Sequence, residues 1–443
     1  MKHKESTQAQ LVEFEFQEVL ADSLNEKEFR IDAKKILEQN LEYNYAIIYF
    51  HVEKFKYINE LFGYENGNKV LQGIDWVLNA NIGSGELCAH RIADQFVLLL
   101  KYQTERELKN KLDKICTDLH QTIEFYGIHY ELAFFMGVYE CKKGDDLSVT
   151  AMIDRAIIAQ KSMRGDSLTA YAFYDDSIRR IQVVEKNMED RLFSALEQHD
   201  FLVYYQPKYD VKAATLAGCE ALVRWKLGED TLVPPNEFIP VFEKSGAIIY
   251  LDRYVFEQVC KNIRQWLDGG KHVAPVSVNL SRVHLRDLSF IEEYKAIADS
   301  FRVPYALLEL ELTESALSDD LEKMILMVKK LHEIGFALSI DDFGSGYSSL
   351  NMLKDIPADV LKLDREFMTD SVKNSKGRKI IENIIRLSKD LGMTVLAEGV
   401  ETNMQLAFLK EAHCDLAQGY YFAKPLPLKE YEILLRSHCD LIE

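Results

Sequence analysis

Beyond residue 200, short apolar runs alternate with segments in which apolar residues recur every three or four positions. Eight runs have the length and composition of strands, and they occupy residues 202–210, 215–225, 274–280, 307–314, 336–342, 359–366, 393–400 and 415–422. Most of the gaps between them hold a helical pattern, as in residues 319–334 and 376–392. Strands that alternate with helices over about 245 residues predict a (β/α)8 barrel.

One gap in this series is too short for a crossover helix. Only a few residues separate Tyr209 from Thr215, whereas two parallel strands need a connection of about a dozen residues or more. The first two strands are therefore predicted to form an antiparallel hairpin, which gives a barrel with an antiparallel first strand.

The first part of the chain has a different order of elements. Residues 1–40 have helical spacing, and residues 41–175 show strand, helices, hairpin, helix, strand, helix and strand patterns in turn. A helical stretch is expected over residues 55–80, and the hairpin turn near residues 92–94. This order predicts an α/β sandwich with helices packed on a mainly antiparallel sheet. Residues 176–199 predict an amphipathic connector helix, which leaves residues 200–443 for the barrel domain.

Charge and cysteine usage narrow the classes of function. The net charge of −18 argues against binding a nucleic acid polymer through a basic surface, but an acidic pocket can hold a phosphate ligand when divalent cations are bound. The chain has no apolar run long enough for a membrane span and begins with a polar stretch, so no secretory signal is expected. Seven scattered cysteines without a CxxC pair fit reduced thiols in the cytoplasm.

Acidic and amide side chains close most of the predicted barrel strands. They are Glu220, Asn279, Glu311, Asp341, Asp342 and Glu398, with Lys362 and Gln418 at the ends of two further strands. The active site of such a barrel lies at the C-terminal ends of its strands. Oxygen ligands without cysteine or histidine favour Mg²⁺ or Mn²⁺, and two such ions can clamp a phosphodiester. Lys362 would then hold the attacking water or offset charge on the phosphate.

Each of these residues has a simpler explanation when it is taken alone. In an acidic chain a single carboxylate is most often solvated surface, and Asp341 with Asp342 is consistent with a helix cap. Lys362 is consistent with a snorkelling lysine, and Gln418 with a residue that satisfies backbone groups at the rim. These explanations do not account for polar residues at the ends of six of eight predicted strands.

The chain from about residue 190 to residue 440 resembles the EAL domain, the cyclic di-GMP phosphodiesterase family. The matching segments are YYQPKYD, EALVRW, FIPVFEKSGAI, SVNLS, LELTES, DDFGSGYSSL, LKLD, AEGVE and QGYYFAKP. The resemblance implies that two divalent cations, Mg²⁺ or Mn²⁺, assist the opening of cyclic di-GMP to linear pGpG.

The resemblance also implies a role for individual residues. The implied metal ligands are Glu220, Asn279, Glu311, Asp341 and Glu398, with Asp342 beside them. The implied catalytic residues are Lys362, at the nucleophilic water, Glu398, assigned as a general base, and Asp342. The implied substrate-binding residues are Gln206, Leu222, Arg224, Asp364, Glu401 and Gln418. Glu314 and Glu401 match residues that steady the loop DDFGSGYSSL, which is intact.

Residues from about 44 to 175 resemble the GGDEF domain, the diguanylate cyclase family, in a degenerate form. FKYINELFGYENGNKVL and DRAIIAQK match two of its helices, but the diagnostic turn is here IADQF. Gln95 and His51 stand where the family has metal-binding acids, and residues 83–86 lack the inhibitory RxxD motif. We therefore expect no cyclic di-GMP synthesis. Asn59 matches a guanine-contacting residue, so GTP binding and a plain scaffold or dimerisation module both stay open.

Three classes of function follow. The leading one is a cyclic di-GMP phosphodiesterase, active as a cytoplasmic homodimer and modulated by the cyclase-like domain. The alternatives are a receptor that binds the dinucleotide without cutting it and a regulatory scaffold. Every position that the chemistry needs is intact, which favours the enzyme.

Overall fold

The computed structural model describes residues 24–39, 42–53, 55–125, 133–142, 144, 146–163, 170–228, 231–314, 321–344, 356–366, 368 and 374–439. The chain divides into two compact units, Met1–Val184 and Glu185–Glu443. The division falls inside helix α7 (Asp176–Glu197), whose buried residues Leu192 and Ala195 belong to the core of the second unit. No helix among the described residues is both long enough and apolar enough to cross a membrane.

The first unit is built on a six-stranded sheet. Its strands are β1 (Leu24–Asn25), β2 (Asn44–Val52), β3 (Leu87–Ile92), β4 (Gln95–Tyr102), β5 (Phe134–Cys141) and β6 (Tyr171–Phe173). They lie in the order β1-β3-β4-β2-β5-β6, with the four central strands antiparallel and the two edge strands parallel to their neighbours. The predicted, mainly antiparallel sheet is confirmed.

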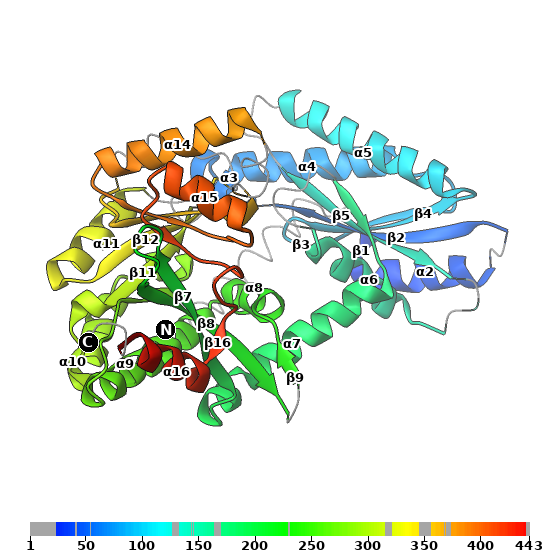
Figure 1. The fold of residues 1–443 in the computed structure, drawn as a ribbon. Helices are drawn as coiled ribbons and strands as arrows, with labels where there is room; N and C mark the ends of the chain where they lie inside the picture. Colours follow the sequence, from blue (N-terminus) through cyan, green and yellow to red (C-terminus); the bar gives the residue numbers. More distant parts are fainter. Residues whose placement is uncertain are drawn as a thin grey trace. The chain divides into compact units, whose positions relative to one another are not determined.

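Helices cover both faces of this sheet (Figure 1). They are α2 (Glu26–Gln39), α3 (Phe55–Phe62), α4 (Tyr64–Ala80), α5 (Glu105–Phe125) and α6 (Val149–Lys161). Alternate residues of β2 point to opposite faces: Ile48 packs in the same core as α4 and α5, and Ile47 in the same core as α2 and α6. At Gly137 of β5, a Cβ atom would lie 1.8 Å from the carbonyl oxygen of Ala156, so only glycine allows α6 to approach this closely.

The second unit is a closed barrel of eight strands. They are β7 (Phe201–Asp210), β8 (Leu216–Leu227), β10 (Val276–Asn279), β11 (Leu308–Thr313), β12 (Ala337–Phe343), β13 (Val360–Leu363), β14 (Thr394–Ala397) and β15 (Leu416–Ala417). The order β7-β15-β14-β13-β12-β11-β10-β8 closes because β7 also pairs with β8. β7 is antiparallel to both neighbours, and the other pairs are parallel. The predicted barrel with an antiparallel first strand is confirmed.

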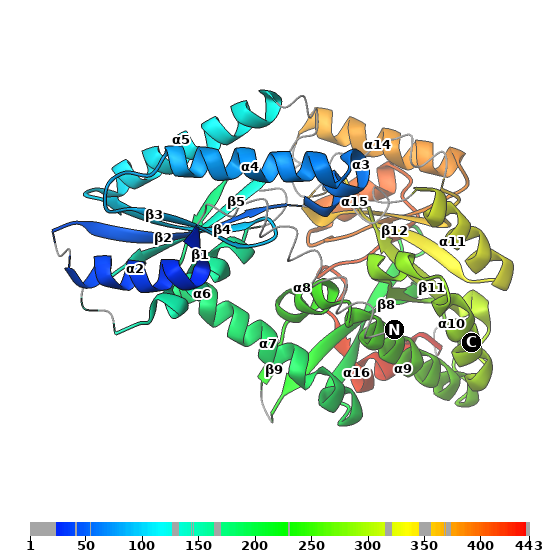
Figure 2. The same ribbon diagram turned by 180° about the vertical axis from the view of Figure 1, so that it is seen from behind.

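Helices lie outside the strands of the barrel, as Figure 2 shows for α9, α10 and α11. Among the described residues, the helices of this unit are α8 (Pro235–Ser245), α9 (Ile248–Asp268), α10 (Phe290–Phe301), α11 (Leu321–Ile334), α14 (Ser375–Asp390), α15 (Asn403–Glu411) and α16 (Leu428–Cys439). Two short 3₁₀ turns, η1 (Arg282–Arg286) and η2 (Tyr305–Leu307), accompany them. The short strands β9 (Thr231–Val233) and β16 (Leu426–Pro427) pair with β8 and β7.

The structure divides one predicted element and shortens another. The helical stretch expected over residues 55–80 consists of two helices, because Gly63 between α3 and α4 adopts a φ of 81° that ends the first one. The last barrel strand, expected over residues 415–422, pairs only over Leu416–Ala417. The helical pattern expected in residues 11–23 lies outside the described residues.

Candidate active site

The barrel strands present polar residues to the interior and apolar residues to the surrounding helices. In β11, Leu308, Leu310 and Leu312 belong to the buried apolar core, and Glu309 and Glu311 alternate with them. In β13, Lys362 lies between the core residues Leu361 and Leu363 in the same way. Because successive side chains of a strand point to opposite faces, these charged groups all enter the barrel.

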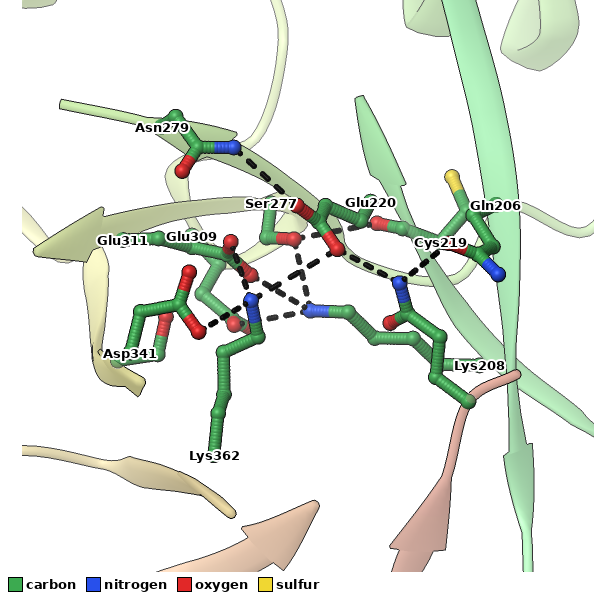
Figure 3. Close-up of polar contacts among 12 residues, drawn as sticks. Gln206, Lys208, Cys219, Glu220, Ser277, Asn279, Glu309, Glu311, Asp341 and Lys362 are labelled. Atoms are coloured by element: carbon green, nitrogen blue, oxygen red, sulfur yellow. Dashed lines mark hydrogen bonds and ion pairs between the residues drawn. The ribbon is translucent and has the colours of Figure 1, made fainter. Parts of the chain in front are cut away.

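Lys362 is the centre of the predicted site, and its side chain is 1% exposed. Its Nζ lies 2.7 Å from Glu311 Oε2, 2.9 Å from Asp341 Oδ1 and 2.8 Å from Glu398 Oε1. Glu220 Oε2 is 3.7 Å away. Strands β8, β11 and β12 and the residue that follows β14 thus bring their predicted carboxylates to one ammonium group, and Figure 3 shows Glu220, Glu311 and Asp341 around it.

Crowding and burial change the acidity of these groups. Burial, followed by repulsion from a neighbouring carboxylate, raises the pKa of Glu220 to about 7 and that of Asp342 to about 6. Burial also raises the pKa of Glu398 to about 8. For Glu311, burial opposes ionisation, but Lys362 and a second buried lysine outweigh it and lower the pKa to about 2. The cluster holds more carboxylates than its lysines neutralise, which favours additional cations.

The carboxylate oxygens form two groups that fit metal ions. One group is Glu220, Glu311 and Asp341, and the other is Asp341, Asp342 and Glu398, with ligand atoms within 4.8 Å of one another in each. Both groups consist of hard oxygen donors, the ligand type of Mg²⁺ and Mn²⁺. Asp341 belongs to both, so the donor set suits two neighbouring ions. Asn279 lies beside the first group, donating from Nδ2 to Glu220 Oε1 at 3.2 Å.

A β-bulge brings two consecutive carboxylates into the same group. β12 pairs through Ile340 with Leu361 and through Phe343 with Leu363, so β12 has one residue more than β13 between these pairs. At this bulge Asp342 adopts a φ of 58°, and its backbone N–H donates to Asp341 Oδ1 at 2.8 Å. In a regular strand the two side chains would point to opposite faces.

Two glutamines, Gln206 and Gln418, lie beside Glu220 in the barrel. Gln418 Nε2 donates to Glu220 Oε2 at 2.6 Å and to Gln206 Oε1 at 3.1 Å. Gln418 Oε1 is buried and has no hydrogen-bond partner among the described residues. Leu222 lines a cavity of 280 Å³ with Glu220 and Asn279. The structure therefore places these predicted substrate-binding residues against the carboxylate cluster.

The structure also shows the neighbours of the remaining predicted substrate-binding residues. Arg224 follows on β8, with its guanidinium 5.6 Å from the centre of the Tyr204 ring. Asp364 is close enough to help raise the pKa of Asp342, and Glu401 pairs with Arg365 at 3.0 Å.

Glu314 contacts the start of the loop that it is predicted to steady. The backbone N–H of Gly344 donates to Glu314 Oε2 at 3.2 Å. Residues 345–350 of this loop lie outside the described residues.

Sequence reasoning missed a second layer of buried polar residues, formed by Lys208, Ser277 and Glu309. Each lies two positions from a predicted site residue on the same strand. A signal for them was present, because alternate residues of a barrel strand share the interior face. On the reversed strand β7 the deeper residue comes after Gln206, and on β10 and β11 it comes before the site residue.

Over residues 189–425, more than half of its length, the sequence matches the EAL domain family. The chain belongs to the EAL domain family. Residues 23–165 match the diguanylate cyclase GGDEF domain family, so a GGDEF domain precedes the EAL domain.

Two curated relatives and one solved structure show the extent of the similarity. Signaling protein YkoW of Bacillus subtilis (strain 168) is 31% identical over 399 residues, which cover 89% of this chain and 49% of YkoW. Cyclic di-GMP phosphodiesterase NbdA of Pseudomonas aeruginosa is 30% identical over 423 residues, covering 94% of this chain and 54% of NbdA. The structure of PaMucR phosphodiesterase in complex with c-di-GMP is 33% identical, with a TM-score of 0.53, and the match covers 55% of this chain and 99% of that chain. The chain thus spans about half the length of the curated relatives it matches.

In the GGDEF domain, His51 and Gln95, which stand where the resemblance expects metal-binding acids, face each other. His51 of β2 pairs in register with Gln95 of β4, and His51 Nε2 lies 3.4 Å from Asp94 Oδ2. The amide oxygen of Gln95 accepts a hydrogen bond from Arg91 at 2.8 Å, and Arg91 also pairs with Glu26. The side chain of Gln95 is therefore held by an arginine.

Asn59, the predicted nucleotide contact, and Glu86, in the segment where the resemblance expects RxxD, also lie on this domain. A Cβ atom at Gly67 would lie 1.9 Å from Asn59 Oδ1, so the Asn59 amide packs directly on the α4 backbone. Glu86, in the segment that lacks RxxD, accepts hydrogen bonds from Gly83 N, Lys101 N and Lys111 Nζ. Its role is structural, and the GTP contact of Asn59 stays a prediction.

Proposed function

We propose that the EAL domain of this chain hydrolyses cyclic di-GMP to linear pGpG with the help of two divalent cations. The observation that carries the proposal is the pair of oxygen groups that share Asp341 in the barrel mouth. The names of NbdA and of the PaMucR complex support the choice of substrate.

The chain's own residues supply the ligands and the positioning groups. The proposed ligands are Glu220, Asn279, Glu311, Asp341, Asp342 and Glu398. When bound, Mg²⁺ or Mn²⁺ would lower the pKa of water and offset charge on the phosphate. Arg224 would pair with a phosphate oxygen, and the substrate would also contact Gln206, Leu222, Asp364, Glu401 and Gln418.

The reaction exchanges one bond at phosphorus. A water oxygen bonds to one phosphorus, the bond from that phosphorus to a ribose 3′ oxygen breaks, and the 3′ oxygen takes up a proton. Glu398 is assigned as the acceptor of the water proton, as the resemblance to the EAL family implies. Lys362 is assigned to the attacking water and to the developing negative charge, with Asp342 completing the catalytic set.

The GGDEF domain is proposed to regulate the barrel without making cyclic di-GMP. The support is the replacement of two metal-binding acids by His51 and Gln95, with Gln95 engaged by Arg91. GTP binding through Asn59 and a homodimer of the whole chain are part of this proposal.

Glu220→Ala tests the assignment of Glu220 as a metal ligand. Because Glu220 belongs to one oxygen group and contacts Gln418, the variant is expected to lose turnover by about a thousandfold, the scale of losing an electrostatic catalytic group, and to remain folded. Turnover is measured as pGpG by chromatography. Glu382→Ala, an exposed glutamate of α14, is the matched control and should turn over normally. Wild-type turnover in Glu220→Ala would contradict the assignment.

A further inference from the structure

Lys208 of β7 lies in the interior of the barrel, one layer further from the C-terminal strand ends than the proposed metal ligands, and Figure 3 shows its ammonium group beside Glu309 and Glu311. The residue is 3% exposed. It follows the predicted substrate-binding residue Gln206 by two positions and points to the same face. None of the roles proposed above uses it.

Three side chains surround its ammonium group. Lys208 Nζ donates to Ser277 Oγ at 2.7 Å, and it lies 3.1 Å from Glu309 Oε1 and 3.1 Å from Glu311 Oε1. Glu311 Oε2 is taken by Lys362 at 2.7 Å. Each oxygen of Glu311 therefore faces its own lysine, one from below and one at the mouth.

A buried ion pair in this place needs a reason. The interior of a (β/α)8 barrel is normally filled by bulky apolar side chains, and a buried pair such as Lys208 with Glu309 is seldom more stable than an apolar replacement. Glu309 supplies the counter-charge. Its side chain is only 10% exposed, and its Oε1 lies 3.1 Å from Lys208 Nζ. Lys208 also contacts Glu311, a proposed metal ligand, and a pair that served only to fill the barrel would not need this contact.

We propose that Lys208 is a positioning residue that holds Glu311 Oε1 in the inner polar layer, so that Oε2, which Lys362 contacts among the other proposed ligands, is the one oxygen of Glu311 directed at a metal ion. This inference rests on the proposed function of the barrel. It makes Lys208 a determinant of metal selectivity as well as of metal affinity.

The selectivity follows from the coordination habits of the ions. Mg²⁺ and Mn²⁺ suit six-coordinate sites in which each carboxylate supplies one oxygen, whereas Ca²⁺ accepts six to eight ligands and takes bidentate carboxylates readily. A glutamate held at one oxygen by Lys208 favours the smaller ions. Without that lysine, Oε1 loses its partner in the inner layer, and Glu311 can turn about its contact with Lys362 to present both oxygens.

Two double variants test this while removing both members of the buried pair. Lys208→Met with Glu309→Leu makes the layer apolar, and Lys208→Gln with Glu309→Gln keeps it polar and neutral. Glu309→Gln alone is the matched control, because it retains Lys208 and an acceptor for it. The full chain is stripped with EDTA and titrated calorimetrically with Mn²⁺ and with Ca²⁺, and circular dichroism checks the fold of each variant.

Both double variants are expected to bind Mn²⁺ about tenfold more weakly than the wild type, the usual scale for losing a partner of a metal ligand. The preference for Mn²⁺ over Ca²⁺ should fall with it, and Glu309→Gln should keep both values. Wild-type affinity and an unchanged Mn²⁺ to Ca²⁺ ratio in a folded double variant would overturn the inference while leaving the proposed function intact. A wild-type chain that takes up no Mn²⁺ would overturn the proposed function and this inference together.

Discussion

At the scale of single residues, the barrel mouth depends on the balance between carboxylates and two buried lysines. Lys362 contacts Glu311, Asp341 and Glu398 within 2.9 Å. The raised pKa values of Glu220 and Glu398 show that the lysines do not neutralise the cluster fully. Burying these carboxylates without further cations therefore lowers the stability of the fold, which is typical of a binding site.

Lys362→Met should destabilise the metal-free barrel and increase its response to metal. Losing the shared ammonium group leaves buried carboxylates unpaired, which is expected to lower the free energy of unfolding by about 2–3 kcal/mol in EDTA, somewhat less than for a fully isolated charge because the carboxyl groups can take up protons. Saturating Mn²⁺ should recover more stability in the variant than in the wild type. Calorimetric melting in EDTA and in Mn²⁺ measures both effects.

Lys389→Met is the matched control for this experiment. Lys389 pairs with Asp415 at 2.6 Å, but its side chain is 40% exposed, so its loss should cost less than about 1 kcal/mol. Equal losses in the two lysine variants, or no added response to Mn²⁺ in Lys362→Met, would contradict the electrostatic account.

At the scale of elements, the site depends on the irregularity of β12. The extra residue between Ile340 and Phe343 lets Asp341 and Asp342 act together, and Asp342 takes a left-handed conformation to do so. Asparagine and aspartate adopt this conformation more readily than β-branched residues. The strain of this φ angle lies in the backbone of Asp342, so its effect on stability can be measured separately from that of the carboxylate charge.

Asp342→Asn and Asp342→Val form the pair that separates them. Both remove the carboxylate, but only valine opposes a φ of 58°, so Asp342→Val should unfold with a free energy about 1–2 kcal/mol lower than Asp342→Asn. Chemical denaturation in EDTA measures the difference. Identical stabilities would mean that the bulge relaxes and that the conformation of Asp342 is not required by the strand.

Much of the arrangement of the barrel strands could be predicted from the sequence, and the exceptions have physical causes. The short gap between Tyr209 and Thr215 predicted the antiparallel pairing of β7 with β8, because chain length alone forbids a crossover. The bulge in β12 could not be predicted, since it depends on how that strand pairs with β13. Lys208 was missed because a lysine inside a strand usually faces solvent, and only the closed barrel turns it inward.

At the scale of the whole chain, a GGDEF domain and an EAL domain follow one another. The first carries His51 and Gln95 where the cyclase resemblance expects metal-binding acids. The second brings all its predicted metal ligands into one cluster. We therefore expect the chemistry of this chain to lie in the EAL domain.

The purified chain should make no cyclic di-GMP from GTP. The Glu220→Ala variant suits this assay, because an active barrel would consume any cyclic di-GMP that the GGDEF domain made. Chromatography after incubation with GTP and Mg²⁺ or Mn²⁺ is expected to show no dinucleotide. Steady accumulation of cyclic di-GMP would show that His51 and Gln95 still support synthesis.

The most direct test of the central claim is the fate of cyclic di-GMP with the wild-type chain. The purified protein is incubated with cyclic di-GMP in EDTA, in Mg²⁺ and in Mn²⁺, with and without GTP, and the products are resolved by chromatography. The account predicts pGpG only when a divalent cation is present. Tight binding of cyclic di-GMP with no pGpG under either metal would contradict it and would identify a receptor.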